Sequence, residues 1–143
     1  MTTLPAFQRE IRPTPQDLAL CSQALSDWLH AQGAPPNGVL RVELVLEELV
    51  MNIITHGGTA LGAAPTIALQ AEASAASCRL HITDNTPPFN PVTTPPRLTA
   101  ASLEAEIPGG LGLLLLQRYS RNPHYEHRAG LNQLSLTVPF EPD

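Results

Sequence analysis

Lysine is absent from this chain of 143 residues, in which all eight basic residues are arginine. Its absence excludes the phosphate-binding lysine of a Walker A motif, a Schiff-base lysine, and the lysine that pairs with nucleotide phosphates in the common protein kinases. The net charge of −5 does not suggest binding to nucleic acid or to an anionic membrane. Any phosphate chemistry in this protein therefore proceeds without a lysine side chain.

Cysteine is scarce, and long apolar runs are missing. Cys21 and Cys78 stand far apart with no Cys-x-x-Cys motif, so we expect neither a metal site nor a disulfide framework, and a reduced setting is expected. Runs such as residues 113–116 are too short to span a bilayer, and the N-terminus lacks the basic and apolar parts of a signal peptide. These features predict a cytoplasmic protein with one domain over residues 1–143.

The strongest helical pattern covers residues 37–58. Asn37 is the predicted N-cap, and the glycine pair at 57–58 is the predicted end. Apolar residues recur at helical spacing and predict one broad buried face: Val42, Val45, Leu46, Leu49, Ile53 and Ile54.

Three polar residues form a row beside that apolar face. Glu48, Asn52 and His56 stand at positions i, i+4 and i+8, so a carboxylate, an amide and an imidazole lie on one side of the helix. A carboxylate can accept a proton or orient a nucleophile, and an amide oxygen is a ligand suited to magnesium. The alternative is that Glu48 and Asn52 are solvated surface residues and His56 caps the helix end.

The remaining elements are predicted from alternation and turn signals. We expect a strand at residues 4–11, then a helix that Thr14 caps and that ends near Gly33. Further strands are expected at residues 66–71, 78–83, 125–128 and 132–138. The Pro- and Thr-rich segment 85–108 fits no long element and is interpreted either as a binding loop or as a disordered surface loop.

Two further pieces have chemistry that suits the helix row. Asp84 ends a predicted strand, and its carboxylate can accept a hydrogen bond from an amino group such as that of adenine. The loop Gly109, Gly110, Leu111, Gly112 and Leu113 opens a predicted helix that runs to about Ser120. Backbone N–H groups at such a helix start bind phosphate without lysine. The loop lacks the third glycine of a Rossmann fingerprint, so the order of the pieces is more informative than any single one.

That order resembles the GHKL ATPase superfamily and, within it, the anti-sigma-factor serine/threonine kinases of the RsbW and SpoIIAB type. The resemblance extends over residues 4–140 and rests on four motifs. The N box fits Glu48, Asn52, His56 and Gly57; the G1 box fits Asp84, Pro87, Pro88, Phe89 and Pro91; the G2 box fits Gly109 to Leu113; the closing pattern Arg-x-Gly-x-Asn-x-Leu fits Arg128, Gly130, Asn132 and Leu134.

The resemblance implies a fold, two cofactors and a set of site residues. The fold is an α/β two-layer sandwich, with a mixed, mostly antiparallel sheet of about five strands and three helices on one face. The cofactors are ATP and Mg²⁺, with Asn52 holding magnesium on the ATP phosphates and Asp84 reading the adenine amino group. Glu48 is implied as the catalytic base or as the group that orients the attacking hydroxyl. The loop Gly109–Gly112 closes over the phosphates, and Leu113 completes its motif.

The resemblance also implies partners. The expected substrate is a serine or threonine of a STAS-type anti-sigma-factor antagonist, and a sigma factor is expected to be held inactive, often by a homodimer of the kinase. Direct contact with nucleic acid or membrane is not expected. One alternative is a partner-binding module with a degenerate nucleotide site and little or no phosphotransfer. A histidine-kinase catalytic domain is a weaker alternative, because no dimerisation helix with a phosphoacceptor precedes the domain.

One position departs from the family pattern. Thr86 stands where the G1 box has glycine, and a β-branched residue resists positive φ. The departure predicts a looser nucleotide site, which Thr86→Gly would improve.

Overall fold

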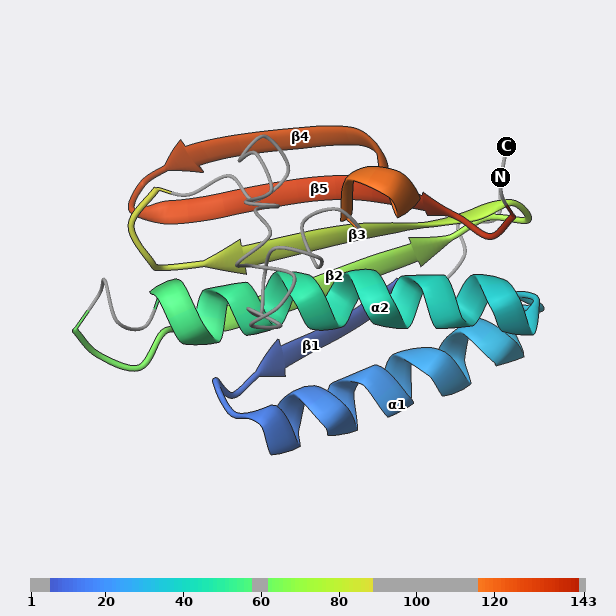
Figure 1. Cartoon of the computed structure of the whole chain (residues 1–143), viewed down its shortest axis with the longest axis horizontal. Helices are drawn as coiled ribbons and strands as arrows, with labels where there is room; N and C mark the ends of the chain where they lie inside the picture. Colours follow the sequence, from blue (N-terminus) through green and yellow to red (C-terminus); the bar gives the residue numbers. More distant parts are fainter. Residues whose placement is uncertain (1–5, 58–61, 89–115, 142–143) are drawn as a thin grey trace, which may run out of the picture.

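The computed structural model describes residues 6–57, 62–88 and 116–141. The elements in chain order are β1 (Phe7–Ile11), α1 (Pro15–Ala31), α2 (Pro36–Asn52), the π-helical turn η1 (Ile53–Gly57), β2 (Ile67–Ala73), β3 (Ser77–Asp84), β4 (Arg121–Arg128) and β5 (Leu131–Pro139). Residues 116–119 form a helical turn before β4. Figure 1 shows α1 and α2 lying together against the sheet.

The strands form one sheet in the order β1-β2-β3-β5-β4, and all four pairings are antiparallel. The predicted two-layer α/β fold class with five strands is confirmed, but the sheet was expected to be mixed and its described pairings are all antiparallel. β4 lies at an edge, and its proline, Pro123, falls within a register shift; both are places where a sheet tolerates proline. A register shift between Arg121 and His124 marks a bulge, and Asn122 adopts a positive φ of 52° there.

The core lies between the two layers. Alternate residues of β2, β3 and β5 are buried, as their alternating sequences predict. They meet a buried helix face that includes Leu25, Leu46 and Leu49. None of the described helices has the length and apolarity needed to cross a membrane.

Both cysteines belong to this core. Cys21 and Cys78 are free and completely buried. Burial raises the pKa of the Cys21 thiol to about 11 and that of the Cys78 thiol to about 12. Both thiols are therefore protonated at neutral pH and act as small apolar groups.

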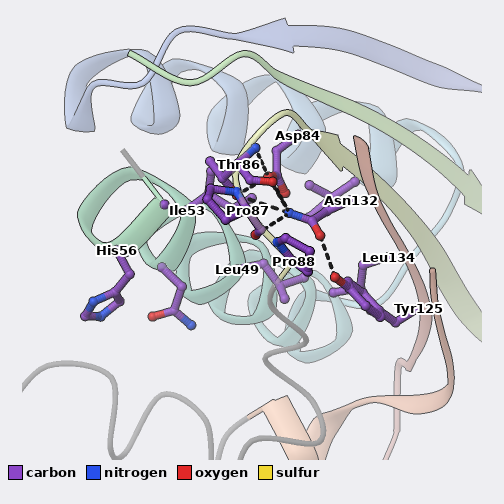
Figure 2. Close-up of a pocket in the computed structure, with 13 residues that line it drawn as sticks. Leu49, Ile53, His56, Asp84, Thr86, Pro87, Pro88, Tyr125, Asn132 and Leu134 are labelled. Carbon is purple, nitrogen blue, oxygen red and sulfur yellow. Dashed lines mark hydrogen bonds between the residues drawn. The ribbon is translucent and has the colours of Figure 1, made fainter. Parts of the chain in front are cut away.

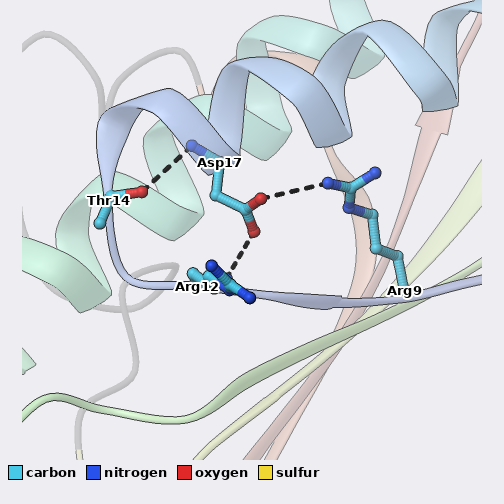
Figure 3. A network of polar contacts seen from close by, with 4 residues as sticks. All are labelled: Arg9, Arg12, Thr14 and Asp17. Atoms are coloured by element: carbon cyan, nitrogen blue, oxygen red, sulfur yellow. Dashed lines mark hydrogen bonds and ion pairs between the residues drawn. The ribbon is translucent and has the colours of Figure 1, made fainter.

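The start of α1 is fixed by a polar network that ties it to β1 (Figure 3). As predicted, Thr14 is the N-cap, and its Oγ1 accepts a hydrogen bond of 3.1 Å from the Asp17 backbone N–H. The Asp17 carboxylate accepts a hydrogen bond of 2.6 Å from the Arg12 backbone N–H and one of 3.2 Å from the Arg9 guanidinium. The Arg12 hydrogen bond, followed by the contact with Arg9, lowers the pKa of Asp17.

The predicted N-cap of the second helix is wrong. The cap is Pro35, which makes no side-chain hydrogen bond, and α2 begins at Pro36 rather than after Asn37. A proline in the first turn is pre-organised for the helix and has no N–H to satisfy. Packing also fixes this end, because a Cβ added at Gly38 would lie 2.5 Å from Phe140 Cβ. Phe140, the residue after β5, thus makes a contact that helical periodicity does not reveal.

Candidate functional site

A cavity of about 260 Å³ opens where the end of α2 meets the ends of β3 and β5. It is mostly apolar, with a few polar groups gathered at one end (Figure 2). The lining residues are Leu49, Asn52, Ile53, His56, Gly57, Ile82, Asp84, Thr86, Pro87, Pro88, Tyr125, Asn132 and Leu134. An apolar cavity with a few convergent polar groups is typical of a small-molecule site.

The polar end of the cavity is built around Asp84, which is only 5% exposed. Its Oδ1 accepts hydrogen bonds from the Thr86 backbone N–H at 2.9 Å, from the Thr86 hydroxyl, and from Asn132 Nδ2 at 2.9 Å. Asp84 and Asn132 are direct partners in the β3–β5 register, so the sheet itself brings them together. A buried carboxylate needs such donors to offset its lost hydration. Asp84 is thus fixed in the cavity wall, as its place at the strand end predicted.

Tyr125 extends this network from the edge strand. Its hydroxyl donates to Asn132 Oδ1 at 2.5 Å. Sequence reasoning gave Tyr125 no part in the site, and Asn132 entered only through the closing pattern. A signal for Asn132 was present: an amide among alternating apolar residues of β5, at a position that the alternation buries. Pairing with β3 is what gives that amide its partner.

Thr86 does not have the strain that the sequence predicted. The only non-glycine residues with positive φ in the described part of the chain are Asn122 and Ala129. Thr86 is buried, and its side chain covers Gly57, where an added Cβ would lie 2.5 Å from Thr86 Cγ2. The glycine needed for close approach thus lies on η1, opposite the threonine. The expected gain in nucleotide affinity from Thr86→Gly stays a prediction, without the strain argument.

Of the three polar residues predicted to form a row on one helix, Asn52 and His56 line the cavity and Glu48 does not. Asn52 is 7% exposed and lines the cavity, and its Nδ2 has no hydrogen-bond partner within residues 6–57, 62–88 and 116–141. A buried donor without a partner costs about 1–3 kcal/mol, so this nitrogen marks a place that a ligand oxygen would stabilise. His56 also lines the cavity but is exposed, and Figure 2 shows it apart from the Asp84–Asn132 cluster.

Glu48 lies one turn before Asn52 on α2, half-buried, and does not line the cavity. Burial, and secondarily the negative charge of Glu47, raises the pKa of the Glu48 carboxyl. A raised pKa makes the carboxylate a stronger base, which is the chemistry predicted for this residue.

The rest of the predicted site lies outside the described residues. This applies to Gly109, Gly110, Leu111, Gly112 and Leu113, and to the segment from Phe89 onward. Within the described ranges, no group of three or more His, Cys, Asp or Glu side chains could hold a metal ion. Magnesium at Asn52 would depend on the amide of this residue together with the phosphates of a nucleotide.

This fold and this site define a class of protein. Residues 11–138 match the histidine kinase-like ATPase domain family, and the chain belongs to it. The resemblance to the GHKL superfamily that the four motifs indicated is thereby confirmed.

The chain is also similar to individual proteins. The chain is 33% identical over 106 residues to the serine/threonine-protein kinase BtrW of Bordetella bronchiseptica, covering 73% of this chain and 74% of BtrW. Its fold is similar to a chain in the SiaB–SiaC complex of Pseudomonas aeruginosa, with a TM-score of 0.59, 20% identity, and coverage of 96% of this chain and 90% of that one. It is also similar to the RsbU and RsbW domains of Rv1364c from Mycobacterium tuberculosis, with a TM-score of 0.57, 18% identity, and coverage of 94% and 32%.

Proposed function

We propose that this protein is an ATP-dependent serine/threonine kinase that phosphorylates a STAS-type anti-sigma-factor antagonist and that also binds and sequesters a sigma factor. The observation that carries the proposal is a cavity that two buried residues line together: the carboxylate of Asp84, and the amide of Asn52, whose nitrogen has no partner among the described residues. The similarity to the kinase BtrW supports the same activity.

The cavity suits the base of a nucleotide. Its volume of about 260 Å³ lies slightly below the roughly 300–1,000 Å³ of sites for drug-sized ligands, so it fits a flat ring better than a whole nucleotide. The apolar wall includes Leu49, Ile82 and Leu134, against which a ring can stack. Asp84 would accept a hydrogen bond from the adenine amino group, and this acceptor would disfavour guanine, which has an oxygen at the corresponding position.

The phosphates would extend from the base toward Asn52 and the glycine loop. Asn52 would hold magnesium on the phosphates through its amide oxygen. Its nitrogen, which has no partner in the described part of the chain, could donate to a phosphate oxygen. Backbone N–H groups of residues 109–113 would supply the contacts that lysine makes in other nucleotide sites. When bound, ATP would supply the phosphoryl group and Mg²⁺ would offset the negative charge of the phosphate oxygens.

Glu48 would act as the base. It would accept the proton of the serine or threonine hydroxyl of the antagonist as that oxygen attacks the γ-phosphorus and ADP leaves. The raised pKa of the Glu48 carboxyl favours this role. Its position outside the cavity favours a role toward the incoming protein substrate rather than toward the nucleotide.

The test is transfer of radiolabelled phosphate from ATP to a STAS-type antagonist. Glu48→Gln should keep nucleotide binding and partner binding but lose transfer by roughly 10²-fold or more. Glu43→Gln is the matched control, because it makes the same change on α2 one and a half turns earlier. Transfer by Glu48→Gln at the wild-type rate would remove Glu48 as the base. A wild-type protein that holds its partner but transfers no phosphate would be a binding module instead of a kinase.

A further inference from the structure

Asn132 has more hydrogen-bond acceptors around its side-chain nitrogen than it has hydrogens to donate. Its Nδ2 lies 2.9 Å from Asp84 Oδ1, 3.0 Å from the Thr86 carbonyl oxygen, 3.1 Å from Thr86 Oγ1 and 3.1 Å from the Pro87 carbonyl oxygen. An amide nitrogen has two hydrogens, so these contacts are shared. One side chain on β5 thus holds both the carboxylate of Asp84 and the turn that follows it.

Tyr125 holds the other end of this amide, whose nitrogen already faces groups that can only accept. The Tyr125 hydroxyl donates at 2.5 Å to Asn132 Oδ1. In the β4–β5 register Tyr125 is opposite Leu134, two residues from Asn132, so the two side chains are on the same face of the sheet. Figure 2 shows the resulting chain of hydrogen bonds from Tyr125 through Asn132 to Asp84.

As a consequence, the two carboxylate oxygens of Asp84 differ in the number of hydrogen bonds that they accept. Within the described residues, every hydrogen bond to this carboxylate ends on Oδ1: one from each of the Thr86 N–H, the Thr86 hydroxyl and Asn132 Nδ2. A carboxylate with one oxygen fixed by three donors cannot rotate freely about its Cβ–Cγ bond. The other oxygen, Oδ2, receives no hydrogen bond within the described residues, and Asp84 lines the cavity, so Oδ2 can accept a hydrogen bond from a ligand there.

We propose that Asn132, held by Tyr125, is a positioning residue that aims Asp84 Oδ2 at the exocyclic amino group of the bound base and thereby sets the preference for adenine. This inference rests on the proposed function. Asn132 acts through Asp84 and contributes to selectivity between bases more than to the binding of the nucleotide as a whole.

The test compares ATP with purine riboside triphosphate, which has the same purine ring without the exocyclic amino group. Wild type should bind ATP roughly tenfold more tightly, which is the value of one hydrogen bond to a charged acceptor. Asn132→Ala should weaken ATP binding while leaving the analogue nearly unchanged, so the preference falls severalfold. A purely structural role would weaken both ligands alike. Ser135→Ala is the control, because Ser135 is also on β5 but contacts His81 on the opposite face of the sheet.

Tyr125→Phe provides a second, milder test that does not depend on Asn132→Ala folding well. It removes the hydroxyl that donates to the amide oxygen of Asn132 and should lower the preference for ATP by about twofold to fivefold, with a smaller effect on the analogue. If Asn132→Ala folds and still prefers ATP over the analogue as strongly as wild type does, this inference is overturned and the proposed function stands. If Asn132→Ala does not fold, the same outcome in Tyr125→Phe decides the question. Equal binding of both ligands by wild type overturns it while nucleotide binding stands. Binding of neither ligand by wild type overturns the proposed function as well.

Discussion

Replacing Asp84 by asparagine changes one atom in the wall of the cavity and leaves its shape intact. The three donors that face Oδ1 would keep an acceptor, because asparagine can present its carbonyl oxygen to Thr86 and Asn132. Its NH₂ group would then replace Oδ2 and meet the adenine amino group donor to donor. The fold should survive, since no buried donor loses its partner.

The loss in ATP affinity follows from that exchange. A hydrogen bond to a charged acceptor contributes about 1.5–3 kcal/mol, so Asp84→Asn should weaken ATP binding by about tenfold to a hundredfold. Titration calorimetry with ATP–Mg²⁺ measures this, and urea unfolding checks that stability is retained. Asp27→Asn makes the same charge change on the exposed side of α1 and should bind ATP as wild type does. Equal titration curves for wild type and Asp84→Asn would show that Asp84 does not contact the nucleotide.

Three other predictions concern the contacts around the cavity and the start of α1. Asn52→Ala should remove the magnesium dependence of ATP binding, measured by titration with and without Mg²⁺. Gly57→Ala should lower the free energy of unfolding, measured with urea, by about 1–3 kcal/mol, because the added Cβ would overlap the Thr86 side chain. Most of this loss should vanish when the same change is made in Thr86→Gly, and an unchanged loss would refute the contact. ATP titration of Thr86→Gly alone checks the predicted gain in affinity. Because the pKa of Asp17 is lowered in the folded state, its contribution is present above the unfolded value of 3.8 and is lost as the pH falls through the folded value. Asp17→Asn should therefore be less stable than wild type at neutral pH, and the difference should shrink as the pH falls below 3.8.

Much of the fold follows from patterns within single segments. Helical spacing from Val42 to Leu49 and alternation from Ile67 to Ala73 each depend only on residues a few positions apart. The cap at Thr14 is equally local, since the hydroxyl and the N–H that it accepts are three residues apart. The start of α2 could not be predicted in this way, and Asn37 was wrongly expected to be its N-cap. This end of the helix depends on Gly38 packing against Phe140, which is distant in the sequence.

The sequence by itself predicted the kind of site, because Glu48 and Asn52 fit one motif of the family and Asp84 fits the next one along the chain. Which groups share the cavity was decided only by tertiary structure. Pairing of β3 with β5 places Asn132 beside Asp84, 48 residues away, and the adjacent edge strand adds the hydroxyl of Tyr125. Hydrogen bonds over such separations depend on sheet order and register, which no local pattern specifies. Tertiary structure also decides how Thr86 fits, although the sequence predicted that a β-branched residue would be unfavourable there. The space that its side chain needs is provided by Gly57 on η1.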